Sequence, residues 1–111
     1  MTAQFSAETR ALAEVRAGGI CEICGAARAY ELHHRRARGM GSTRRVESAG
    51  AANALFACPG CHRLVESHRN LASLLGWLVP QQKRPDAISV LYRGQWARLT
   101  DDGQVTYEWA A

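Results

Sequence analysis

The sequence has no long run of apolar residues and no recognisable secretory signal. No stretch approaches the roughly 20 apolar residues that a membrane-spanning helix requires, and residues 1–5 show no basic segment leading into an apolar one. Internal repeats and low-complexity tracts are also missing. Hydrophobic residues nevertheless make up 47% of the 111 residues, too many for a disordered chain. We therefore expect a small cytoplasmic domain with no membrane association, whose modest core needs a staple.

Lysine is almost absent. Of the 14 basic residues, Lys83 is the only lysine and all the others are arginine, against 10 acidic residues and a net charge of +4. The planar guanidinium group suits phosphate better than a mobile ammonium does, which favours a nucleic-acid partner. A GC-rich genome, indicated by the abundant Ala and Gly, explains the same preference equally well. The positions of the arginines must decide between the two.

Four cysteines form two C-x-x-C pairs, Cys21-Glu-Ile-Cys24 and Cys58-Pro-Gly-Cys61, separated by the segment 25–57. In a chain without a secretory signal, two such pairs indicate a tetrahedral zinc site before they indicate disulfides. Gly25 and the Pro59-Gly60 pair allow the tight turns that this spacing requires. Two separate redox or buried cysteine pairs are the alternative. The prediction is a structural zinc site, which says nothing about activity.

The four histidines gather around these pairs. His33 and His34 are adjacent, His62 directly follows Cys61, and His68 lies six residues further on. Because four thiolates already complete a zinc tetrahedron, the histidines are free for other chemistry. They suggest a second constellation made of His33, His34, His62 and Glu66.

The histidine pair lies in the segment 29–35, whose alternation predicts a strand. Successive strand residues face opposite ways, so His33 and His34 cannot both perform the same task. One of them is suited to bind a metal while the other remains a base.

The segment 62–71 has the pattern of a helix that continues towards Leu75. Residues four apart share a helix face, so His62 and Glu66 can converge on one ion. His68 points largely elsewhere, which favours Glu66 as the third ligand and leaves His68 as solvated surface.

The order of these residues resembles the zinc-knuckle branch of the HNH endonuclease family. The matching string is Cys21-x-x-Cys24, Leu32-His33-His34, Asn53 and Cys58-x-x-Cys61-His62. The resemblance covers roughly residues 20 to 70 and extends more weakly into 76–79, which is similar to small phage and actinobacterial members. It implies an α+β fold with a ββα-metal finger, in which two antiparallel strands and a helix hold one catalytic divalent ion. A four-cysteine zinc site would staple that finger.

The resemblance also implies a role for each matching position. His33 would bind the catalytic metal, His34 would be the general base that activates water for attack on phosphorus, and Asn53 would brace the loop and so orient His34. His62 would be the second ligand. Glu66 stands where some relatives carry a histidine, so the third ligand stays open between Glu66, His68 and water. Such a site accepts Mg²⁺, Mn²⁺, Ni²⁺ or Zn²⁺.

Five arginines follow the histidine pair, and no acidic residue occurs from Leu32 to Val46. Together with the glycines and serine of the same loop, they predict a docking surface for a polyanionic strand. A solvated basic loop with no partner is the alternative. Arg69 on the predicted helix would extend the surface, whose expected DNA-binding residues are Arg35, Arg36, Arg38, Arg44, Arg45 and Arg63.

The flanking segments are predicted to pack on this centre. Ser6 is expected to cap a helix that runs to about Arg16 and ends at Gly18-Gly19, with Ala11, Leu12 and Val15 on its buried side. Residues 1–80 would form the nuclease domain. Residues 81–111 would add a β appendage with strands at 88–92, 95–99 and 104–109. Its small apolar face, or alternatively a surface that stacks on bases, would consist of Trp96, Tyr107 and Trp109.

The sequence thus predicts a metal-dependent endonuclease that hydrolyses DNA phosphodiester bonds, the kind of domain used in restriction, phage and mobile-element systems. A non-catalytic, zinc-stapled nucleic-acid-binding module is the alternative. A zinc-stapled protein-interaction domain is a third, but it leaves the clustered arginines unexplained. A homodimer or a larger phage or restriction assembly is compatible with cutting both strands.

Overall fold

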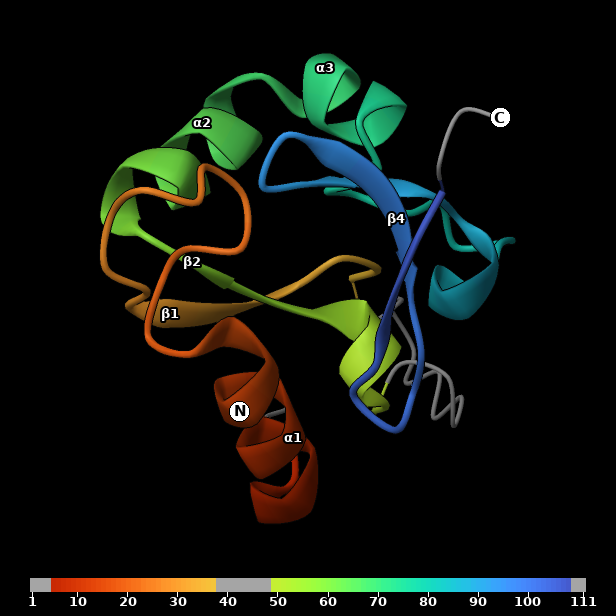
Figure 1. Ribbon diagram of the computed structural model, residues 1–111. Coiled ribbons are helices and arrows are strands. Elements are labelled where there is room, and N and C mark those ends of the chain that lie inside the picture. The colour runs from red at the N-terminus through yellow and green to blue at the C-terminus, as the bar shows by residue number, and fades with distance from the viewer. Residues whose placement is uncertain (1–4, 38–48, 109–111) are drawn as a thin grey trace.

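Two small antiparallel sheets and three α-helices make up the part of the chain that this computed structural model describes, residues 5–37 and 49–108. The helices are α1 (Ala7–Ala17), α2 (Pro59–Ser67) and α3 (Arg69–Leu74), with 3-10 turns η2 (Ala51–Asn53) and η3 (Pro85–Ala87). One sheet pairs β1 (Glu31–His34) with β2 (Ala54–Ala57), and the other orders β3 (Val90–Tyr92), β4 (Gln95–Leu99) and β5 (Val105–Tyr107). The predicted α+β class is confirmed (Figure 1).

Helix α1 has the predicted caps. The Ser6 hydroxyl accepts a hydrogen bond from the backbone N–H of Thr9 at 3.1 Å, which satisfies one of the free donors of the first turn. Gly18 ends the helix in the left-handed region at φ 61°, and its N–H donates to Glu14. Glycine is the preferred residue at this position after a helix, because a side chain is strained in the left-handed conformation.

The buried face of α1 differs from the prediction. Ala11 is exposed, Leu12 is only partly buried and Val15 is 84% exposed, whereas Ala13 and Ala17 are buried. The helix packs through these small residues against Ala54 and Phe56 of β2. Alanines let the helix axis approach the strand closely, so the larger apolar side chains turn outward.

The β1–β2 hairpin lies between α1 on one side and α2 on the other (Figure 1). Its register pairs Glu31 with Ala57 and His34 with Ala54. Strand β1 is shorter than the predicted segment 29–35, but backbone hydrogen bonds extend the pairing at each end, from Tyr30 to Ala57 and from Arg35 to Asn53. Both faces of β2 are covered, which explains its unbroken run of apolar residues.

The predicted helix from 62 towards 75 is two helices. It begins earlier, at Pro59, a residue suited to the first helical position. It is interrupted at His68, where φ is −129° and ψ is 64°. Ser67, His68 and Asn70 all have weak helix propensity, so little local preference opposes the break.

The C-terminal sheet belongs to the same core as the hairpin. Val90, Tyr92, Ala97 and Leu99 share one apolar cluster with Leu55 and Val65. Trp96 and Tyr107 do not form the predicted apolar face: they are 41% and 38% exposed, and Tyr107 pairs with Ala97, which places it on the sheet face opposite to Trp96. The alternative, a surface that stacks on bases, stays a prediction. The alternation of β4 instead turns its small and aliphatic residues inward, and Trp109 lies outside the described part of the chain.

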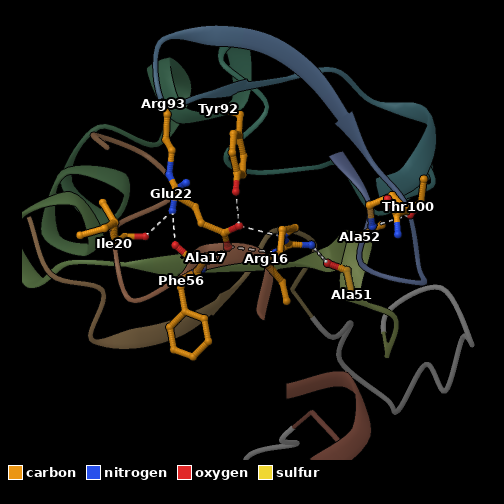
Figure 2. Close-up of polar contacts among 12 residues, drawn as sticks. Arg16, Ala17, Ile20, Glu22, Ala51, Ala52, Phe56, Tyr92, Arg93 and Thr100 are labelled. Carbon is orange, nitrogen blue, oxygen red and sulfur yellow. Dashed lines mark hydrogen bonds and ion pairs between the residues drawn. The ribbon is translucent and has the colours of Figure 1, made fainter. Parts of the chain in front are cut away.

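A buried carboxylate connects these layers. Glu22, between the first two cysteines, is completely buried and accepts two hydrogen bonds from Arg16, at 2.6 and 2.9 Å. It also accepts from the Tyr92 hydroxyl at 2.7 Å and from the Phe56 backbone N–H at 2.8 Å (Figure 2). Burial, reinforced by the Glu22 charge, raises the pKa of Tyr92, so the phenol stays protonated and donates. One carboxylate therefore joins α1, β2 and β3.

Replacing Glu22 by Gln should lower the free energy of unfolding of the zinc-loaded protein by about 3–5 kcal/mol, because it leaves the buried Arg16 charge without its counterion. Urea denaturation followed by circular dichroism at fixed zinc concentration measures the change. The control is Glu14→Gln, which alters an exposed i,i+4 pair with Arg10 and should change stability by less than about 0.5 kcal/mol. Equal stability of the two variants would contradict the role given to Glu22.

Candidate functional site

The four cysteines come together as one cluster. Their sulfur atoms all lie within 4.8 Å of one another, with Cys21 and Cys58 buried, Cys61 partly buried and Cys24 exposed. Zn–S bonds of about 2.3 Å place the sulfurs of a tetrahedral site about 3.8 Å apart, so the cluster is compatible with a structural zinc ion. The first pair lies in the turns between α1 and β1, and the second lies at the start of α2. A metal here would link the turns that lead into β1 to the start of α2, which follows β2.

Backbone amides surround the sulfurs as a thiolate site requires. N–H donors reach them at 3.4 to 3.5 Å, from Ile23 and Cys24 to Cys21, from Ala27 to Cys24 and from Cys61 to Cys58. The hydrogen bond from Ala27 contributes most to lowering the pKa of Cys24 to about 6. Burial raises the pKa of Cys61 in the metal-free chain. The donor set and its surroundings fit zinc.

Strand alternation separates the histidine pair, as predicted. His33 is buried, and its ring centroid lies 5.8 Å from that of His62 on α2. His34 is partly buried, and its ring stacks on Phe5 with centroids 4.0 Å apart and planes 14° from parallel. The two side chains therefore have different neighbours and are suited to different tasks.

Hydrogen bonds fix one ring nitrogen of His33 and one of His62. Nε2 of His33 lies 2.9 Å from the Trp77 carbonyl oxygen, and Nδ1 of His62 lies 2.8 Å from a Glu31 carboxylate oxygen. Because both oxygens only accept, the neutral rings carry their protons on these nitrogens. Desolvation lowers the pKa of His33, which favours its neutral form. In its neutral form, each ring thus has one unprotonated nitrogen for a cation.

The histidine pair and the two other predicted metal ligands border one open hollow of about 250 Å³. His33, His34, His62 and Glu66 all border it, together with Leu32, Ala37, Arg69 and Leu78. His68, the alternative third ligand, is exposed and does not border it. The hollow therefore favours Glu66 among the predicted ligands.

The candidate ligand atoms in the hollow lie near one another, but they do not converge on a single position that a metal ion could occupy. Within the described residues, only the cysteines bring three or more ligand atoms within 4.8 Å. Glu66 places one oxygen 3.9 Å from Nε2 of His62 and the other 3.3 Å from Arg69. A cation would have to draw these side chains a short way inward.

Asn53 holds the backbone that follows the histidine pair. Its side chain is completely buried, accepts a hydrogen bond from the Arg36 N–H at 2.6 Å and donates to the Arg36 carbonyl oxygen at 3.2 Å. Its own carbonyl oxygen accepts from the N–H of Arg35 at 2.8 Å. Asn53 therefore anchors the two residues after His34, which is where a brace would act.

The prediction that Arg35 and Arg36 bind DNA is wrong, because both are buried, with 0% and 1% exposure. The Arg35 guanidinium donates to four backbone carbonyl groups, those of Gly76, Ala52, Pro85 and Ile88. Burial, with a smaller effect of Arg16, lowers its pKa to about 9, which leaves it charged at neutral pH. Arg36 donates to Lys83. Both side chains tie the end of β1 to the C-terminal half.

The other predicted DNA contacts divide into two groups. Arg63 and Arg69 are exposed on α2 and α3, and Arg69 borders the hollow. Arg38, Arg44 and Arg45 lie outside the described residues.

The roles of two glutamates, Glu22 and Glu31, were not predicted from the sequence. Glu31 could have been found, because it lies two residues before His33 and so shares its strand face. Glu22 carries no such signal, since a charged residue between two cysteines is typical of an exposed turn.

The four-cysteine cluster gives a spectroscopic prediction. The chain reconstituted with one equivalent of Co²⁺ should show the intense visible absorption of a tetrahedral thiolate complex, because four sulfurs surround the ion. Cys58→Ser should weaken that absorption and lower thermal stability, whereas His68→Ala should change neither. A Co²⁺ spectrum of octahedral type in the unaltered chain would exclude the four-cysteine site.

Comparison with known proteins adds no relative: no family model, no curated protein and no solved structure matches this chain. Among the described residues, no helix is both long and apolar enough to cross a membrane. What can be said about function therefore comes from the residues and their arrangement.

Proposed function

We propose that this chain is a zinc-stapled, metal-dependent HNH endonuclease that hydrolyses DNA phosphodiester bonds. The observation that carries the proposal is the pairing of His33 with the Trp77 carbonyl group and of His62 with Glu31. Metal-binding histidines characteristically donate their second ring N–H to a carbonyl or carboxylate group. The order β1, β2, α2 around these histidines is that of the finger which the sequence resembles.

Three side chains would hold the divalent cation: His33, His62 and Glu66. The bound cation would stabilise the negative charge that develops on the phosphate oxygens and on the departing 3′-oxygen. Two imidazoles and one carboxylate fit Mn²⁺, Ni²⁺ or Zn²⁺, and they accept Mg²⁺ less well.

His34 would take the proton from the attacking water. Imidazole suits general-base catalysis near neutral pH, and His34 borders the same hollow as the ligands. Phe5 restrains one face of the ring, and Asn53 anchors the backbone that follows it. Restraint from both sides limits how far the base can move relative to a bound phosphate.

Among the described residues, Arg69 is the basic residue best placed to contact that phosphate. It borders the hollow and is more than half exposed, while its guanidinium pairs with Glu66 at 3.3 Å. Engagement of Glu66 by a cation would release Arg69 for the substrate. Arg63, and the arginines at 38, 44 and 45, would add contacts to the DNA backbone.

A non-catalytic, zinc-stapled nucleic-acid-binding module is the second candidate. It is favoured by the cysteine cluster being the only group of at least three ligand atoms within 4.8 Å among the described residues. Such a module would bind DNA through the arginines, and its affinity for DNA would not change when His34 is replaced.

His34→Ala should lower the rate of supercoiled plasmid cleavage by about 10²- to 10⁴-fold, because the attacking water loses its base. Zinc content and circular dichroism should stay unchanged, and His68→Ala should cleave like the unaltered protein. A folded, zinc-loaded His34→Ala variant that cleaves at the full rate would overturn the assignment. Absence of cleavage by the unaltered chain with every candidate metal would favour the binding module.

A second divalent cation should bind to the zinc-loaded chain, more weakly than zinc. Calorimetric titration with Mn²⁺ should show one site, which His62→Ala abolishes and His68→Ala preserves. The zinc content of both variants should equal that of the unaltered chain, because the cysteines lie outside the hollow. If mild chelation unfolds the protein together with removal of Mn²⁺, the chain has one metal site instead of two.

A further inference from the structure

Glu31 is the first residue of β1 and borders the candidate ligand His62 without having an assigned role. Its Oε1 lies 2.8 Å from Nδ1 of His62, with the Glu31 side chain 48% exposed and the His62 side chain 33% exposed. The contact joins residues 31 positions apart in the sequence. The distance of 2.8 Å between Nδ1 and Oε1 is typical of a hydrogen bond to a charged carboxylate.

The position of Glu31 follows from the hairpin. Glu31 and His33 are two residues apart in β1, so both project from the same strand face. Helix α2 contacts β1, and His62 occupies the first turn of that helix. One strand face thus supplies His33 as a ligand and Glu31 as the neighbour of the other ligand.

The contact determines which nitrogen of His62 faces the hollow. A carboxylate accepts only, so Nδ1 of the neutral ring carries the proton and Nε2 carries the lone pair. Nε2 is the nitrogen nearest to Glu66, at 3.9 Å. Without Glu31, the ring is free to rotate and to place its proton on Nε2, which would block metal binding there.

We propose that Glu31 is a positioning residue that holds His62 in its Nδ1–H tautomer and directs Nε2 towards the divalent cation. This inference rests on the proposed function, because it concerns the same metal site. Loss of such a hydrogen-bonded partner typically weakens metal binding about 10- to 100-fold. A surface ion pair without this role would change folding stability slightly and metal affinity not at all.

Glu31→Ala tests the inference in two ways. In the zinc-loaded chain without a second metal, ¹⁵N spectra of the imidazole at pH 8 should show His62 protonated at Nδ1 before the change and mainly at Nε2 after it. The dissociation constant for Mn²⁺ should rise about 10- to 100-fold, with zinc content and melting temperature unchanged. Glu31→Gln, which retains an acceptor oxygen but no charge, should recover part of the affinity. Glu14→Ala, an exposed change on α1, should alter neither measurement.

The outcomes separate the two proposals. Equal Mn²⁺ affinity and an unchanged tautomer in Glu31→Ala would overturn the role of Glu31 and leave the proposed function intact. Failure of the unaltered zinc-loaded chain to bind Mn²⁺ would overturn the proposed function, and the metal-positioning role of Glu31 with it.

Discussion

The rest of the structure depends on the buried ion pair between Arg16 and Glu22. Glu22 lies between Cys21 and Cys24, so the turn that presents two thiolates is also the turn that carries the buried charge. Arg16 completes its hydrogen bonds by donating to the carbonyl oxygens of Ala51, the first residue of η2, and of Ala54, the first residue of β2. A buried pair is costly unless every lone pair and proton is satisfied. Among the described residues, every buried side-chain nitrogen and oxygen atom has a hydrogen-bond partner. The ion pair and the four-cysteine cluster therefore act on the same turn.

At the end of β1, the hairpin that follows this turn is held by a second buried arginine, Arg35. Four carbonyl dipoles solvate the Arg35 guanidinium. Three of these bonds join the residue after His34 to the segment between α3 and β3, and the fourth joins it to η2. Asn53 fixes the next residue. The hollow consequently lies on a strand that is anchored before and after the histidine pair. Such rigidity is what a site needs if a base and its metal ligands must keep their relative positions.

The sequence predicted those parts of the molecule that depend on local spacing. The caps of α1 and the shared helix face of His62 and Glu66 follow from residues a few positions apart. The cysteine cluster joins two distant pairs, but the C-x-x-C spacing within each pair is the local signal that predicted it. Parts that depend on distant partners were missed or wrong. Arg35 was expected to contact phosphate because it belongs to the arginine cluster beside the histidine pair. It is buried instead, with its guanidinium bonded to carbonyl groups far away in the sequence, such as those of Ala52 and Ile88. The prediction that Val15 is buried was wrong for the same reason, since the close approach of β2 decides which face of α1 is covered.

The central claim, that the hollow binds a divalent cation through two prepositioned histidines, is tested most directly by anomalous diffraction from zinc-loaded crystals soaked in Mn²⁺. We predict two peaks, one inside the four-cysteine cluster at the zinc edge and one in the hollow at the manganese edge, within roughly 2.3 Å of a nitrogen of His33 and of His62. A manganese peak that is absent, or that lies away from both histidines, would contradict the account.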